Sequence, residues 1–513
     1  MIDLTDTLTL NVRGDTLICV PASLEQFTTY VLLEQEDWFE DEIRFLRRWL
    51  RPGMHAVDVG ASFGVYATAI SKAVGPGGRV WAFEPTPDTA NFLQRTSELN
   101  HLDQVIVVRK ALADRAGDVS FIMNASSEIN AIELDGASGR DCVTVPCTTL
   151  DRAAAEHGWS RVDFVKLDVE GAELEVVLGG REFLAASTPL VMFEIKTEVV
   201  DLRVLEPLAA MGYEFYRLLP GMLVLAPFDS QQPVDKFQIN LFACKPERAA
   251  ELAAAGLLVN DGEAPAGKAA AEAWEAYARD TPYSRGLAKL WRSNASFFAK
   301  ADVKSYFAGL AAFAESCRPG HGAAAKLRLV TRAFERVAES LESSNALARK
   351  ISYARLAFEL GARDAAVNAL DEVARRLAEM EPPLPNEPFL APSSRYEKIA
   401  AGDSPHEWLQ CAVLDQLEKL RAFSSLFTGT SALDALAPIA DSALRLPEME
   451  RRRQLVRMRA GLQRAPEAVP LLAHRSEQNL NPDFWRGAGL RQPETVRATM
   501  FPIVSALRDL VPR

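Results

Sequence analysis

Short apolar runs alternate with amphipathic stretches across the first half of the chain, from about Met54 to Lys245. A short run rich in Val, Ile, Leu or Phe that ends in a turn or a polar residue is typical of a buried β-strand. Stretches with helical spacing lie between these runs, and this alternation predicts a parallel sheet with crossover helices. The seven predicted strands are residues 56–59, 79–83, 105–110, 164–167, 190–194, 214–218 and 239–244. The first half is therefore predicted to be a doubly wound α/β domain.

Weaker local signals agree with this alternation. Thr86 precedes a proline, and Thr148 to Asp151 have the spacing of a capping box, so we expect helices to begin at both places. Phe121 to Met123 predict an extra strand or hairpin between the third and fourth main strands.

The pattern changes after Lys245, where Ala- and Leu-rich segments with helical spacing replace the strand-like runs. We expect residues 1–245 to form one domain, residues 246–268 to be a linker because Gly and Pro gather there, and residues 269–513 to form an all-α bundle. Within it, residues 350–378 have the spacing of part of a tetratricopeptide unit. One unit is not an array, so an ordinary helical hairpin is the favoured interpretation.

Composition narrows the function classes. The 513 residues are 48% hydrophobic and 25% charged, which is ordinary for a soluble globular protein, and the net charge of −12 disfavours a surface that binds nucleic acid. The six cysteines show no metal-ligand spacing, and the first ten residues lack the basic start of a secretory signal. With no apolar run long enough to cross a bilayer, the chain is predicted to have no membrane span and to be cytoplasmic.

The sharpest motif is the loop Asp58-Val-Gly-Ala-Ser-Phe-Gly64, which follows the first predicted strand and precedes a helix. Gly60 and Gly64 lack the side chains that would block a ligand, and the helix N-terminus offers free N–H groups, so Ala61 and Ser62 are predicted to lie against a ligand. Asp58 lies inside the strand, where it is predicted to hold either the N–H groups of the turn or an ammonium group of the ligand.

The nature of this ligand follows from two further acids. Glu84 ends the second strand, where a carboxylate can accept hydrogen bonds from both hydroxyls of a ribose. Asp114 follows the third strand, where it is predicted either to accept the adenine amino hydrogen or to be an ordinary turn residue. Dinucleotide folds prefer G-x-G-x-x-G, whereas the loop glycines here are four apart, so S-adenosylmethionine suits the loop better than a nicotinamide cofactor.

Six segments together resemble one family, the FkbM methyltransferases. They are Glu36–Glu42, Asp58–Gly64, Phe83-Glu84-Pro85, Ala111–Asp114, Thr149-Leu-Asp151 and Lys166-Leu-Asp-Val-Glu-Gly-Ala-Glu173. The resemblance covers residues 1–245 and implies a seven-stranded, Rossmann-like class I methyltransferase domain. It also implies S-adenosylmethionine as the methyl donor and acceptors that are hydroxyl groups of sugars or polyketide-type natural products.

Acids at the ends of two later strands are the candidate catalytic residues. Asp168 and Glu170 follow the fourth strand and Glu194 ends the fifth, and ligands of open parallel sheets bind at these carboxyl ends. No histidine is placed to take a proton from an alcohol, so a carboxylate base or a metal-bound alkoxide remains. Asp168 and Glu170 could hold a divalent ion, but metal-free catalysis is favoured because no clear third ligand is evident. Lys166 and Lys196 flank these acids.

An upstream segment has two interpretations. Tyr30, Trp38 and Glu40 lie outside the predicted sheet, so the segment could fold over the acceptor as a lid, with aromatic faces against a sugar ring. Simple packing of Trp38 against the sheet is equally compatible with the sequence.

The favoured function is an S-adenosylmethionine-dependent methyltransferase acting on a hydroxyl of a sugar, a glycoconjugate or a polyketide-type natural product. Its partners would be a small-molecule or glycan acceptor and, through the C-terminal helices, a protein. The alternative is a helical protein-interaction scaffold that carries a donor-binding but non-catalytic module. An intact loop and Glu84 argue against this alternative.

Overall fold

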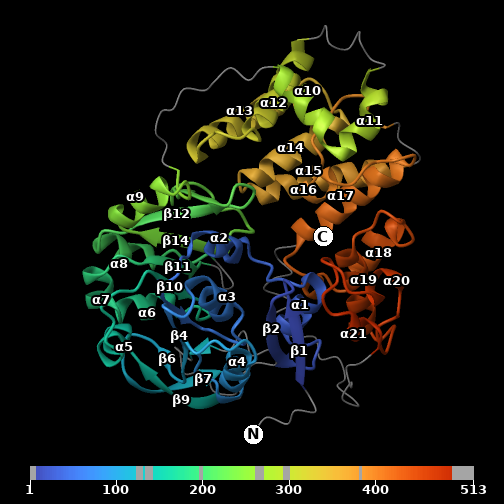
Figure 1. Ribbon diagram of the computed structural model, residues 1–513. Coiled ribbons are helices and arrows are strands. Elements are labelled where there is room, and N and C mark those ends of the chain that lie inside the picture. The colour runs from blue at the N-terminus through green and yellow to red at the C-terminus, as the bar shows by residue number, and fades with distance from the viewer. Residues whose placement is uncertain are drawn as a thin grey trace.

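A mixed eight-stranded sheet forms the centre of the first half (Figure 1). The computed structural model describes residues 7–122, 131–132, 142–195, 200–259, 271–292, 301–379 and 384–487. The strands lie in the order β13-β12-β14-β11-β10-β3-β4-β5. Their bounds are β3 His55–Val59, β4 Arg79–Phe83, β5 Val105–Val108, β10 Phe164–Leu167, β11 Leu190–Glu194, β12 Glu214–Leu219, β13 Val224–Pro227 and β14 Asn240–Cys244.

The seven strands predicted from the sequence are all present. Strands β5, β4, β3, β10 and β11 run parallel, whereas β14 is antiparallel to both β11 and β12. The eighth strand, β13, pairs antiparallel with β12 at the edge of the sheet. Chain order reverses between β3 and β10, and a reversal of this kind is where open α/β sheets bind their ligands. The doubly wound prediction is therefore confirmed, with one strand added.

Two hydrophobic cores cover the two faces of this sheet, because successive residues of a buried strand point to opposite sides. On one face, Ala56 and Phe164 pack with α2 (Asp41–Trp49), α3 (Val65–Val74) and α9 (Pro246–Ala254). On the other face, Val57 and Val165 pack with the helices that follow β9 to β11. These are α5 (Leu150–His157), α6 (Glu173–Leu178), α7 (Arg181–Ala186) and α8 (Leu205–Ala210).

Smaller elements complete the first half. β1 (Thr7–Val12) and β2 (Thr16–Pro21) form a hairpin that precedes α1 (Phe27–Gln35), and α4 (Pro87–Leu99) joins β4 to β5. A four-stranded sheet has the order β6-β9-β7-β8. Its strands are Ala111–Leu112, Cys142–Thr148, Gly117–Ile122 and Ala131–Ile132. β7 confirms the extra strand predicted at Phe121, while Met123 lies outside the described residues.

The two predicted helix starts had different outcomes. Thr86 is the N-cap of α4, as the sequence predicted. The cap of α5 is Thr149, whose hydroxyl accepts a hydrogen bond from the backbone N–H of Arg152, so the cap lies one residue later than predicted. An N-cap side chain must lie directly before the first helical residue, where it can reach the free N–H groups of the first turn. Thr148 is the last residue of β9, so Thr149 takes this position.

The second half is built of helices around a separate hydrophobic core, which confirms the predicted all-α region. The helices are α10 Ala271–Asp280, α11 Pro282–Arg292, α12 Ala301–Ser316, α13 Ala323–Leu341, α14 Leu347–Glu359, α15 Arg363–Ala378, α16 Ser394–Glu397, α17 Pro405–Arg421, α18 Ser431–Leu436, α19 Pro447–Arg459, α20 Pro470–Ala473 and α21 Pro482–Trp485. Where the tetratricopeptide spacing lies, α14 and α15 form a hairpin around Gly361. Among the described residues, no helix is both long and apolar enough to cross a membrane.

The predicted linker begins too early. Residues 246–254 form α9, and Leu258 then makes a bridge to Leu225 beside the main sheet. Ala249, Leu252 and Leu257 are buried in the core of the first half, so an apolar helix face outweighed the small-residue composition that suggested a linker. Residues 260–270 lie outside the described residues.

The two halves also share a core, which the predicted domain division did not anticipate. Leu455 and Met458 of α19, Leu472 of α20 and Trp485 of α21 are buried with residues of β1, α1 and α2. Figure 1 shows α19, α20 and α21 beside α1 and the β1–β2 hairpin, although these segments lie at opposite ends of the chain. The C-terminal helices are therefore part of the packing around the first half.

Candidate functional site

The loop after β3 passes very close to neighbouring backbone. Its N–H groups at Gly60 and Ala61 donate to the carbonyl of Phe83, at 3.1 and 3.0 Å. Gly60 has φ of +78°, and a Cβ there would lie 1.8 Å from the carbonyl oxygen of Asp168. Gly64 has φ of +88°, and a Cβ there would lie 2.5 Å from a methyl of Leu93. Both positions therefore require glycine, and their predicted role in letting a ligand approach stays a prediction.

Glu84 lies against this loop. Its two carboxylate oxygens accept the backbone N–H groups of Ser62 at 3.1 Å and Thr86 at 2.9 Å. The side chain is buried at 7% exposure, and this burial raises its pKa to about 7. The hydroxyl of Ser62 is buried without a hydrogen-bond partner among the described residues. The loop and Glu84 therefore form a compact polar site with an unsatisfied donor and a carboxylate.

Asp58 faces a lysine. The Nζ of Lys166 lies 3.6 Å from Asp58 and 2.9 Å from Asp168, and it is nearly fully buried between them. Burial opposes the charge on Lys166, but the carboxylates of Asp168 and Asp58 raise the pKa of the lysine. Burial also raises the pKa of Asp58, while the Lys166 charge opposes that rise. Of the two roles predicted for Asp58, holding the N–H groups of the turn is wrong, because those of Gly60 and Ala61 donate to Phe83 and that of Ser62 donates to Glu84. Its role toward an ammonium group of a ligand stays a prediction.

The three candidate catalytic acids meet at the carboxyl end of the sheet. One carboxylate oxygen from each of Asp168, Glu170 and Glu194 lies within 4.8 Å of the others. Burial and the neighbouring charges of Glu170 and Asp168 raise the pKa of Glu194 well above its ordinary value. Three convergent carboxylates could also hold a hard cation. The sequence favoured catalysis without a metal because Asp168 and Glu170 had no clear third ligand beside them. In the structure Glu194 lies where such a third ligand would be.

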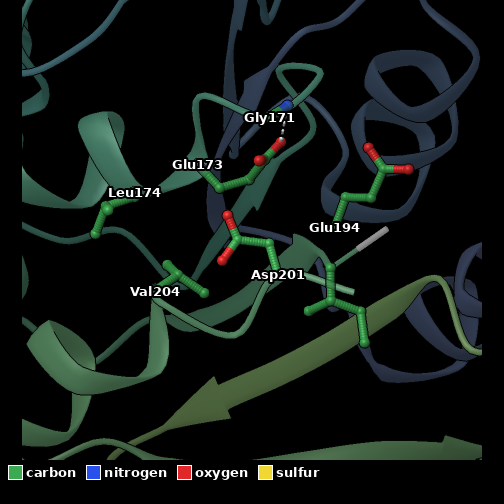
Figure 2. A pocket seen from close by; sticks show the side chains of 7 residues that line it. Gly171, Glu173, Leu174, Glu194, Asp201 and Val204 are labelled. Atoms are coloured by element: carbon green, nitrogen blue, oxygen red, sulfur yellow. Dashed lines mark hydrogen bonds between the residues drawn. The ribbon is translucent and has the colours of Figure 1, made fainter. Parts of the chain in front are cut away.

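The turn that carries Glu170 is held by a further acid. Glu173 accepts the N–H groups of Val169 at 2.9 Å and Gly171 at 3.5 Å, and its burial raises its pKa to about 7. Figure 2 shows a small hollow here, with the Glu173 carboxylate bonded to the Gly171 N–H and the Glu194 carboxylate directed away from Asp201. The hollow is lined by Gly171, Glu173, Leu174, Glu194, Ile195, Asp201 and Val204. Glu173 was not among the predicted site residues, although its motif was recognised.

Glu40 is a member of the site that the sequence placed only in a lid segment. Its carboxylate accepts hydrogen bonds from the indole N–H of Trp38, the hydroxyl of Tyr66 and the side-chain amide of Asn240, each at 2.7 Å. Burial, followed by the charge of Asp168, raises its pKa. Tyr30 is fully buried in the hydrophobic core, and its hydroxyl is hydrogen-bonded to that of Ser425.

One predicted cofactor residue stays apart from this arrangement. The Asp114 side chain is 43% exposed and lies 3.6 Å from its neighbour Arg115. Neither the exposure of Asp114 nor its contact with Arg115 identifies a ligand, so its role toward adenine stays a prediction. Lys196 lies outside the described residues.

Comparison with known proteins finds a family whose model matches the part of the chain that contains this site. Residues 58–215 match the model of the methyltransferase FkbM domain. The chain is 26% identical over 201 residues to the 2-O-methyltransferase NoeI of Sinorhizobium fredii (strain NBRC 101917 / NGR234), an alignment covering 35% of this chain and 76% of that protein.

Two solved structures also align with part of the chain, at low TM-scores. The methyltransferase FkbM from Methylobacillus flagellatus KT aligns at 17% identity with a TM-score of 0.26, over 37% of this chain and 43% of its own. A SAM-dependent methyltransferase from Aquifex aeolicus aligns at 18% identity with a TM-score of 0.24, over 41% of this chain and 90% of its own. The family match begins at Asp58 and spans the loop, Glu84 and the three acids. The match to the methyltransferase FkbM domain therefore covers the segment from residue 58 to residue 215.

Proposed function

We propose that the protein transfers a methyl group from S-adenosylmethionine to a hydroxyl of a sugar, a glycoconjugate or a polyketide-type natural product. The observation that carries this proposal is that the glycine loop with Glu84 and the three acids lie together at the carboxyl ends of neighbouring strands. The loop of residues 60–64 and Glu84 lie at the ends of β3 and β4, and the three acids lie at the ends of β10 and β11. A donor held by the loop and Glu84 would direct its methyl toward the three acids.

The residues present fit this donor. A glycine loop without side chains suits close approach of a ligand, and the unpartnered Ser62 hydroxyl is free to bind it. Glu84 would accept the two hydroxyls of the ribose, and Asp58 would face the ammonium of the amino-acid part. When bound, the donor supplies an electrophilic methyl group on a sulfonium.

The acids would act on the acceptor. Methyl transfer forms a carbon–oxygen bond, breaks the carbon–sulfur bond and leaves the hydroxyl proton to be taken by a base. Glu194 is the proposed base, because its carboxylate converges with Asp168 and Glu170 and one of its oxygens has no hydrogen-bond partner among the described residues. Burial also raises its pKa, which strengthens its affinity for a proton. Asp168 is paired with Lys166 and would orient the hydroxyl. The name of the relative NoeI, a 2-O-methyltransferase, favours an oxygen acceptor.

The test has two stages. Calorimetric titration with S-adenosylhomocysteine measures donor-site binding, and transfer from a labelled donor into free monosaccharides and a cell extract then measures activity. The proposal expects both, and absence of binding would overturn it. Binding without transfer to any fraction would favour the scaffold alternative. A parallel series with a chelator tests for a cation between the three acids, because restoration by Mg²⁺ would replace the carboxylate base with a metal-bound alkoxide.

A further inference from the structure

Glu40 reaches the acid cluster from a distant part of the chain. It lies between α1 and α2, yet it holds Tyr66 of α3 and Asn240 of β14 at 2.7 Å each. Asn240 is the register partner of Glu194 in the antiparallel β11–β14 pair. Directly opposite residues of such a pair have neighbouring side chains on one face of the sheet. Glu40 therefore acts on a residue that stands beside the proposed base.

A second contact leads from Glu40 to the other side of the cluster. The Tyr66 ring lies under the ammonium of Lys166, whose Nζ is 5.0 Å from the ring centroid. Lys166 in turn pairs with Asp168 at 2.9 Å. All three partners of Glu40 donate a hydrogen, so three of the roughly four acceptor positions of its carboxylate are used. Glu40 is thus fixed in place and fixes its neighbours.

The segment just before Glu40 is anchored by the C-terminal helices. Glu34, which is fully buried, pairs with Arg452 of α19 at 2.8 Å and accepts the N–H of Ser425 at 3.0 Å. Glu36 accepts the N–H groups of Leu480 and Asn481, at 2.8 and 3.2 Å. These contacts join residues more than 380 positions apart.

Aromatic packing continues this anchor to the edge of the site. Phe39 lies against Phe423 with ring centroids 5.3 Å apart, and Phe27 lies against Phe427 at the same separation. Phe27 also contacts Trp38 at 5.5 Å, and Trp38 donates to Glu40. Both rings from the C-terminal half therefore support the residues that surround Glu40.

We propose that Glu40 is a positioning residue of the methyl-transfer site, and that the C-terminal helices hold it there through Glu34 and Glu36. This inference rests on the proposed function. It also gives the second half of the chain a role in methyl transfer, because the C-terminal helices support the residues that surround the three acids. Glu40 acts by fixing Asn240 beside Glu194 and Tyr66 beside Lys166.

Glu40→Gln tests the positioning role in the full-length protein. All three partners of Glu40 are hydrogen-bond donors, and the glutamine side chain replaces one of the two acceptor oxygens with an NH₂ group, which is itself a donor. At least one of the three hydrogen bonds is therefore lost. We expect kcat for transfer from labelled donor to fall about tenfold or more, as the loss of one charged hydrogen bond would produce. The Kd of S-adenosylhomocysteine should stay within about threefold, because the donor loop is untouched. Unchanged kcat and acceptor KM would overturn the role of Glu40.

Arg452→Lys tests the anchor, with Arg349→Lys as its matched control. Arg349 pairs with Glu387 at 2.9 Å and is also buried at 1% exposure, but its guanidinium lies over the ring of Tyr306, which belongs to the core of the second half. We expect only Arg452→Lys to raise hydrogen–deuterium exchange in residues 36–42 and to lower kcat. Equal effects of the two variants, or no change in exchange, would overturn the anchoring role. If the wild-type protein fails to bind S-adenosylhomocysteine, the proposed function is overturned instead. The exchange measurement would still show whether Arg452 anchors residues 36–42.

Discussion

Donor-site affinity should depend on pH through Glu84. Burial raises the pKa of this carboxyl from 4.5 to about 7, which corresponds to a preference of roughly 3 kcal/mol for the neutral form. Accepting both ribose hydroxyls requires the ionised form, and two charged hydrogen bonds at roughly 1.5 kcal/mol each would recover most of that cost. The pKa of Glu84 should therefore return toward its ordinary value in the complex.

The sign and size of the effect follow from linkage. Below pH 7 the free protein carries a proton on Glu84 that binding must release, so affinity falls as the pH falls. The loss is at most about tenfold per pH unit, or about a hundredfold between pH 7 and pH 5. Calorimetry with S-adenosylhomocysteine at several pH values gives the slope, and buffers of different ionisation enthalpy count the released protons.

Two variants separate Glu84 from other titrating groups. Glu84→Gln should bind more weakly at pH 8 and lose the pH dependence. Glu173→Gln should keep it, because Glu173 also has a pKa raised to about 7 but bonds to the turn of Val169 and Gly171. A flat profile in the wild-type protein, or an unchanged slope in Glu84→Gln, would refute the ribose assignment.

Three further predictions concern the loop, the acids and a helix cap. Gly60→Ala should abolish S-adenosylhomocysteine binding in calorimetry, since its Cβ would overlap the Asp168 carbonyl, whereas Gly75→Ala, also at positive φ but in open space, should bind normally. Asp168→Asn and Glu194→Gln should each lower turnover at least about tenfold with donor affinity nearly intact, and unchanged turnover in either would remove its role. Thr149→Ala should cost about 1 kcal/mol of unfolding free energy in thermal melts, through loss of its hydrogen bond to Arg152.

Local sequence patterns contained much of the fold and part of the site. The seven strands were predictable because each is a short apolar run that must be buried, and alternation with helices specifies a parallel sheet. Gly60, Gly64 and Glu84 were predictable because a tight turn and a strand end impose their chemistry within a few residues. Asp168 and Glu194 could be brought together in advance because the carboxyl ends of parallel strands share one edge.

Only tertiary packing decided the remaining features. Glu40 enters the site through Asn240, 200 positions later, and Glu34 meets Arg452, 418 positions later. Such contacts depend on how whole helices dock, and the spacing of residues within one segment does not predict this docking. The same reason explains the misplaced boundary, because α9 and the C-terminal helices α19 to α21 bury their apolar faces on the first half. The sequence by itself determined the glycine loop after β3, whereas the position of Glu40 beside the acids arose from the docking of the two halves.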